Sequence, residues 1–149
     1  MPPLVRYGIG FESHLQNVVV RVNAKTKKVS GFAVRDLEGT RIHYPTFRKN
    51  SGYELKLPAQ SPHLANDCRV PWNKVHHSII QDHVAPILHT LGIESHGGWT
   101  IVREELEKSL NPSGDPDAKG LWEYFTQEQM PIPRFLGMRL LGYYKEASL

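Results

Sequence analysis

The chain has 149 residues, 40% of them hydrophobic and 22% charged, and a formal net charge of +3. These values suit one globular domain, 1–149, that needs no disulfide or metal to hold its core. No apolar run approaches the roughly 18 residues of a transmembrane helix, so we expect no membrane partner. Cys68 is the single cysteine, which excludes an intrachain disulfide and favours a soluble intracellular protein of the cytoplasm or nucleus.

Period-two alternation of apolar residues predicts four antiparallel strands between Asn17 and Leu57. Three turns separate the strands, at 24–28, 37–39 and 50–52. An antiparallel sheet with one buried face shows this alternation of apolar and polar residues. The apolar phase is formed by Val18, Val20, Val22, Phe32, Val34, Ile42, Tyr44, Tyr53, Leu55 and Leu57.

Apolar residues at helical spacing predict a helix over Asn73–Leu91, with its first residue as the N-cap and a kink at Pro86. Two further helices are predicted at 100–110 and 118–129, and alternation within 134–145 favours a strand. The predicted fold class is therefore α+β. We expect an antiparallel β-meander of four to five strands, covered on one face by two to three helices.

The charges divide the chain into two unlike halves. Residues 1–60 hold ten Lys or Arg against four Asp or Glu, whereas residues 61–149 hold eight against eleven. The basic half is rich in predicted strands and the acidic half in predicted helices. Such asymmetry indicates an anionic partner for the basic half, although the two halves could equally attract each other or simply be solvated.

A polyanion-binding surface is the first functional hypothesis. Lys and Arg side chains on the polar face and turns of the predicted sheet would contact phosphates, as in proteins that bind single strands. The hypothesis is a module that binds nucleic acid or another polyanion, as an accessory subunit of a larger assembly. Its binding residues would be Arg21, Lys25, Lys27, Lys28, Arg35, Arg41, Arg48, Lys49 and Lys56.

The turn spacing from Arg35 through Gly52 to Pro58 resembles that of the septation-regulator family. The resemblance covers less than a third of the chain. It implies an analogy of fold, and no functional residue is transferred from it.

A small cofactor-independent enzyme, such as an isomerase, lyase or hydrolase, is the second hypothesis. Its candidate catalytic residues are His43, His76 and Cys68, in a pocket near the proline-containing loop 58–72. Histidine is the side chain whose ordinary pKa suits proton transfer near neutral pH. The simpler interpretation is that the histidines are solvated or lie at the edge of the core, and that the cysteine fills apolar space.

Metal ligation is not predicted. His76 and His83 are seven residues apart, which separates them by roughly 10 Å along a helix, too far to share one ion. Neither an HExxH nor a CxxC motif is present, so we expect no metal and no cofactor. A third hypothesis is a protein–protein interaction subunit whose acidic half faces its partner.

Overall fold

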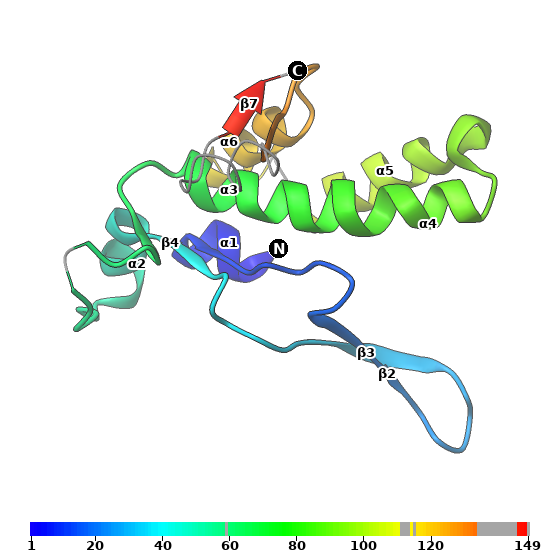
Figure 1. The fold of residues 1–149 in the computed structure, drawn as a ribbon, viewed down its shortest axis with the longest axis horizontal. Helices are drawn as coiled ribbons and strands as arrows, with labels where there is room; N and C mark the ends of the chain where they lie inside the picture. The colour runs from blue at the N-terminus through cyan, green and yellow to red at the C-terminus, as the bar shows by residue number, and fades with distance from the viewer. Residues whose placement is uncertain (59, 111–113, 115, 134–145, 149) are drawn as a thin grey trace, which may run out of the picture.

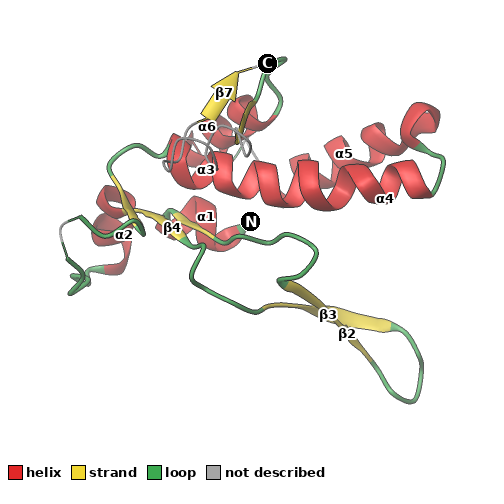
Figure 2. Cartoon of the chain, viewed as in Figure 1, coloured by secondary structure: helices red, strands yellow, loops and turns green. Residues whose placement is uncertain are grey.

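The computed structural model describes residues 1–58, 60–110, 114, 116–133 and 146–148. Figure 1 shows one long helix along the body, shorter helices beside it, and a β-hairpin that extends away from the body. Helices and strands are both present, and the strands form small separate sheets (Figure 2). The predicted mixture of helices and strands is thus confirmed, although its arrangement differs from the expected one.

Three short strands form the sheet of the body. They are β1 (Ile9–Gly10), β4 (Arg41–His43) and β5 (Leu64–Ala65), in the order β1-β4-β5. β1 runs antiparallel to β4, and β5 runs parallel to β4 on its other side. The hairpin consists of β2 (Val18–Val22) and β3 (Val29–Val34). A further antiparallel pair is formed by β6 (Pro131–Pro133) and β7 (Glu146–Ser148).

The predicted four-stranded meander is not confirmed. Its first two strands form the hairpin, but Ile42 of the third pairs with Ile9 and Leu64 in the body. The residues after this strand form helix α2 (Tyr44–Ser51), which ends at Gly52 in the left-handed conformation with φ of 71°. Residues 53–57, the predicted fourth strand, are not in a strand.

The long helix contains α3 (Arg69–Val75), the π-helical segment η1 (His76–Val84) and α4 (Ala85–Thr90). It starts four residues before the predicted N-cap. Pro86 lies just after the π-helical turns, and the Ala85 N–H donates to Ile80 O, five residues back. Wider turns suit this position because proline has no N–H and clashes with the carbonyl four residues before it.

The end of the long helix is as predicted. Gly92 has φ of 66°, and its N–H donates to His89 O. The following N–H, of Ile93, donates to Leu88 O. These two bonds form a Schellman motif, which requires a left-handed residue that glycine provides without strain.

The core lies between helices. It joins the long helix to α1 (Pro2–Tyr7), α5 (Trp99–Leu110) and α6 (Pro116–Phe125), with η2 (Glu94–Gly98) leading into α5. Its buried members are Leu4, Val75, Leu110, Ala118, Leu121 and Phe125. The helices therefore cover one another rather than the apolar face of a meander.

Two sequence-based expectations need a separate remark. The strand expected within 134–145 falls outside the described residues. Among the residues that the structure describes, no helix has both the length and the apolar character needed to cross a membrane.

His76 is a buried histidine of the long helix. Its side chain packs edge-on against Phe125, with ring centroids 5.2 Å apart, and only 6% of the residue is exposed. Burial, and then the charge of neighbouring His77, lower the pKa of His76 from 6.5 to about 4. The ring is therefore neutral at physiological pH.

β1 approaches the long helix closely at Gly10. A Cβ atom at this position would lie 2.7 Å from Pro71 O and 3.0 Å from Pro71 Cβ. The contacted atoms belong to the backbone and to a rigid ring, so they cannot turn aside. Glycine thus lets the body sheet lie directly on the start of the long helix.

We expect Gly10→Ala to destabilise the protein by about 1–3 kcal/mol, because the added methyl group forces β1 away from Pro71. Thermal or denaturant unfolding would measure this loss. Gly120→Ala is the matched control: its Cβ would meet Trp72 at an ordinary 3.5 Å. Within helix α6 this change should be neutral or stabilise by up to about 1 kcal/mol. Equal stability of Gly10→Ala and wild type would contradict the proposed close packing.

We expect stability to fall as the pH drops from about 6.5 towards 4. In this interval the unfolded chain binds a proton at His76 that the folded chain, with its lowered pKa, does not. The contribution of His76 to the free energy of unfolding is complete above pH 6.5 and amounts to about 3 kcal/mol. Chemical unfolding at several pH values should show a shallower dependence for His76→Phe than for wild type. An equally steep dependence in the variant would contradict this role of His76.

Candidate functional site

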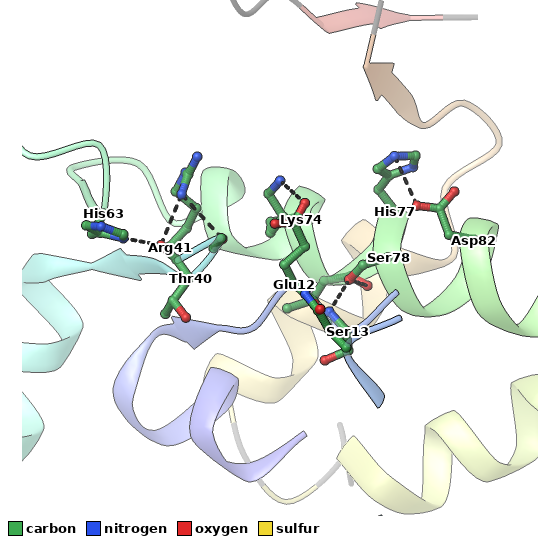
Figure 3. A network of polar contacts seen from close by, with 12 residues as sticks. Glu12, Ser13, Thr40, Arg41, His63, Lys74, His77, Ser78 and Asp82 are labelled. Carbon is green, nitrogen blue, oxygen red and sulfur yellow. Dashed lines mark hydrogen bonds and ion pairs between the residues drawn. The ribbon is translucent and has the colours of Figure 1, made fainter. Parts of the chain in front are cut away.

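A row of polar side chains lies where the segment after β1 crosses the long helix (Figure 3). We call it the polar seam and define it as Glu12, Ser13, Lys74, Ser78 and His83. The Ser13 N–H donates to Ser78 Oγ at 3.1 Å, and both residues are buried. His83 Nδ1 lies 3.4 Å from Ser13 O. The helix therefore binds both the N–H and the carbonyl of one residue, which fixes the segment in place.

An ion pair between Glu12 and Lys74 closes one end of the polar seam. Glu12 Oε1 lies 2.9 Å from Lys74 Nζ, and the two side chains are only 31% and 12% exposed. The Glu12 carboxyl group also occupies the space where a Cβ atom of Gly39 would stand. Partial burial strengthens the pair relative to one in water. The carboxylate thus joins the first loop, the turn before β4 and the helix.

The π-helical segment determines which side chains face one another. In η1, two contacts link residues five apart: His77 Nε2 lies 3.3 Å from Asp82 Oδ2, and Gln81 Nε2 lies 3.4 Å from His76 Nδ1. A third contact, between His77 Nδ1 and Gln81 Oε1 at 2.8 Å, links residues four apart. Ser78 and His83, also five apart, both contact Ser13. In an α-helix, residues three or four apart share a face. The wider turns, which bond residues five apart, instead align these three pairs.

The base of the hairpin is tied to the segment that carries the polar seam. Buried Asn17 donates from Nδ2 to Glu12 O at 3.1 Å, and its carbonyl accepts from the Arg35 N–H at 2.8 Å. Arg35 Nε donates to Gln16 O at 2.8 Å, while the Gln16 N–H donates to His14 Nδ1 at 3.2 Å. One residue, Gln16, therefore holds both an imidazole and a guanidinium group beside the polar seam.

Two of the three predicted catalytic residues share a cavity. His43 and Cys68 line a space of about 260 Å³ between α1, α2, α3 and α6, beside the 58–72 loop. His43 Nδ1 lies 2.8 Å from Thr46 Oγ1, and its Nε2 lies 3.2 Å from Asn66 O. The carbonyl can only accept, so Nε2 carries the proton and Nδ1 accepts from the hydroxyl. Both ring nitrogens thus have protein partners.

The third candidate, His76, does not line this cavity. It packs in the core beside Phe125, with the lowered pKa described above. Burial, followed by the charge of Asp67, raises the pKa of Cys68 above its usual value. The thiol therefore remains protonated at neutral pH, which makes it a poor nucleophile.

The nine cations predicted to bind a polyanion lie on several elements and not on one sheet. Four lie on the hairpin or its loop: Arg21, Lys25, Lys27 and Lys28. The others occupy different elements. Arg35 follows the hairpin, Arg41 is in β4, Arg48 and Lys49 are in α2, and Lys56 is in the loop after it. The prediction of a common cationic face depended on the four-stranded meander, which the structure does not form.

Several residues of this region escaped the sequence analysis. Glu12 and Ser13 lie in a segment without periodicity, and Lys74 and Ser78 occupy polar positions of a predicted helix. A polar cluster in a loop just before a strand, here from Glu12 to Asn17, is a signal that could have identified the segment.

Within the described residues, no group of three or more His, Cys, Asp or Glu side chains is placed to hold a metal ion.

Comparison with known proteins identifies the family. Residues 1–147 match the family described as ferric iron reductase FhuF-like transporter. An NRPS-independent siderophore synthetase-like protein of Aspergillus thermomutatus is 42% identical over 146 residues, 98% of this chain and 24% of that protein. An NRPS-independent siderophore synthetase of Rhizopus delemar is 26% identical over 98% of this chain and 23% of its own length.

A D-ornithine–citrate ligase of Staphylococcus aureus is 26% identical over 72% of this chain and 17% of its own length. The chain thus spans about a quarter or less of the curated relatives it matches. No solved structure matches it significantly.

These relatives correct the functional hypotheses drawn from the sequence. The nucleic-acid-binding hypothesis is wrong, because the matching family and its relatives are named for iron and siderophore chemistry. The same finding overturns the hypothesis of a small isomerase, lyase or hydrolase. The turn spacing that resembles septation regulators does not indicate membership of that family. The match over residues 1–147 shows that the chain belongs to the ferric iron reductase FhuF-like transporter family.

Proposed function

We propose that this chain forms part of a siderophore-assembling ligase that joins a carboxylic acid to an amine. The observation that carries the proposal is its 42% identity, over 98% of its length, to a siderophore synthetase-like protein. The ligase among the relatives is named for citrate and D-ornithine, an acid and an amine. We therefore take citrate as the probe for the acid substrate.

Joining an acid to an amine requires two things of a ligase site: an activated carboxylate, and donors that bind the rest of the acid. Condensing a carboxylate with an amine releases water and is unfavourable in dilute solution, so a ligase activates the carboxylate, commonly with a nucleoside triphosphate. A polycarboxylate also needs fixed cationic donors that hold its remaining carboxylates still. Guanidinium groups bind carboxylates through two parallel hydrogen bonds, and imidazole N–H groups provide single directed donors.

The base of the hairpin supplies both kinds of donor. His14 Nδ1 accepts from the Gln16 N–H, so the proton of the neutral ring is on Nε2, which is a donor. Arg35 is held through Nε by Gln16 O, which orients the guanidinium group. We assign the citrate carboxylates to this corner, next to the Glu12–Lys74 ion pair.

Ferric iron reduction, the activity in the family description, is the second candidate. A reductase needs a redox centre, and an iron–sulfur cluster would need about four thiolate ligands. This sequence supplies one cysteine, Cys68, whose pKa is raised by burial. The residues present do not fit such a cluster, so the ligase is the better supported function.

We expect the chain to bind citrate, and Arg35→Gln to weaken that binding about tenfold, equivalent to about 1.4 kcal/mol. The loss follows from removing a charged donor that faces a carboxylate. Isothermal titration of citrate into wild type and variant at moderate salt would measure it.

Arg48→Gln is the matched control for this titration. Arg48 is also an exposed arginine, but it lies on α2 and pairs with Glu54 at 2.8 Å. Its replacement should leave citrate affinity unchanged. Absence of citrate binding by the wild type, or equal effects of the two substitutions, would argue against the assignment.

A further inference from the structure

One face of the hairpin is an apolar strip that the described residues leave exposed. Directly paired residues of antiparallel strands share a face, and the pairs Val18–Val34, Val20–Phe32 and Val22–Val29 all lie on the same one. We call these six residues the hairpin strip. Five of them are exposed, from 36% for Val34 to 67% for Phe32.

The opposite face of the hairpin differs in character. It carries the pairs Val19–Ala33 and Arg21–Gly31. It therefore offers a smaller apolar area, interrupted by a charge. A partner that buries apolar surface would select the hairpin strip over this face.

The uncovered strip is physically unusual. A two-stranded hairpin in water is marginally stable by itself, and it normally needs a third strand or packing against another element. Figure 1 shows the hairpin extending away from the helices of the body. A contiguous exposed apolar patch of this kind marks an interaction surface.

The relatives indicate what the partner is. They are about four times as long as this chain, and the alignments with the two fungal proteins cover 98% of it. The hairpin thus belongs to a segment that, in those proteins, accompanies several hundred further residues. Within the described part of this chain, the buried apolar side chains of the helices are already packed in the core.

We propose that the hairpin strip docks onto a protein surface equivalent to the part of the siderophore synthetases that this chain does not match. The inference rests on the proposed function in one respect: the siderophore synthetases serve as the guide to the chemistry of the partner surface. The docked surface is apolar opposite Val20 and Phe32. It is acidic near the loop of the hairpin, which carries Lys25, Lys27 and Lys28.

Docking at this place bears directly on the candidate site. The base of the hairpin is held to the body by Asn17 and Arg35, whose hydrogen bonds join it to the polar seam. Arg35 directly follows Val34, so alternation places it on the face opposite the hairpin strip. A surface seated on the strip would therefore fix the position of the hairpin, and with it the position of Arg35, without covering the citrate corner.

The test uses the free chain and a chimera in which this chain replaces the matched segment of the Aspergillus thermomutatus relative. Hydrogen exchange of the β2 and β3 amides should be at least about tenfold slower in the chimera than in the free chain. Val20→Lys combined with Phe32→Lys should abolish this protection and lower the melting temperature of the chimera by about 5 °C or more.

The matched control places the same two charges on the other face of the same strands. Val19→Lys combined with Ala33→Lys should leave the protection in the chimera unchanged. In the free chain, where both faces are uncovered, the two double variants should have similar melting temperatures.

Several outcomes would overturn the proposal. One is fast exchange of the hairpin in a chimera whose helices remain protected. Equal effects of the two double variants would show that the strip is not the docking face. A free chain that sediments as a dimer, and as a monomer with Val20→Lys and Phe32→Lys, would identify a second copy as the occupant. Aggregation of the chimera while both parent proteins remain dispersed would also count against docking.

These measurements are independent of the proposed ligase activity. They involve neither citrate nor product formation. Failure of citrate to bind the free chain would thus leave the docking result intact, and loss of docking would leave the citrate titration intact.

Discussion

The rest of the structure depends on the seating of one short segment against the long helix. Gly10 lies against Pro71, Glu12 pairs with Lys74, and Ser13 binds Ser78. The segment therefore runs along successive turns of the helix and touches each of them. Because the hairpin follows this segment directly, its position is set by the same contacts. Removing Glu12 alone would leave the ammonium group of a largely buried lysine without its carboxylate, a more serious loss than breaking an exposed pair.

The π-helical segment is the second constraint, and it shows how backbone geometry selects side-chain neighbours. Such turns are uncommon and occur often at functional sites. Here they bring Ser78 and His83 to the same residue, Ser13, and they pair His77 with Asp82. An α-helical path over these residues would place the members of each pair on different faces. The position of Pro86 just after these turns gives a local reason for the wider path.

Local features of the fold could be predicted, whereas long-range pairing could not. Rules that involve only neighbouring residues account for two features. One is the alternation of apolar residues in β2 and β3, and the other is the glycine that ends the long helix. Pro45 follows Tyr44, the last apolar residue of the predicted third strand, and Gly52 was placed in the predicted third turn. The same two residue types also suit the ends of a helix, proline in the first turn and glycine after the last. In the structure they have these positions in α2. The polar seam escaped prediction because its residues come from segments some sixty positions apart, without a shared motif.

The hairpin shows why a correct pattern led to a wrong function. Alternation established that Val20 and Phe32 share an apolar face, and the structure agrees. Alternation does not establish what covers that face. The predicted cover was the helices of this chain, and the opposite, basic face was therefore assigned to nucleic acid. In the structure the helices bury one another, and the strip stays exposed. An apolar face that the described residues leave exposed gains stability when another surface buries it, which is what the docking proposed above would supply.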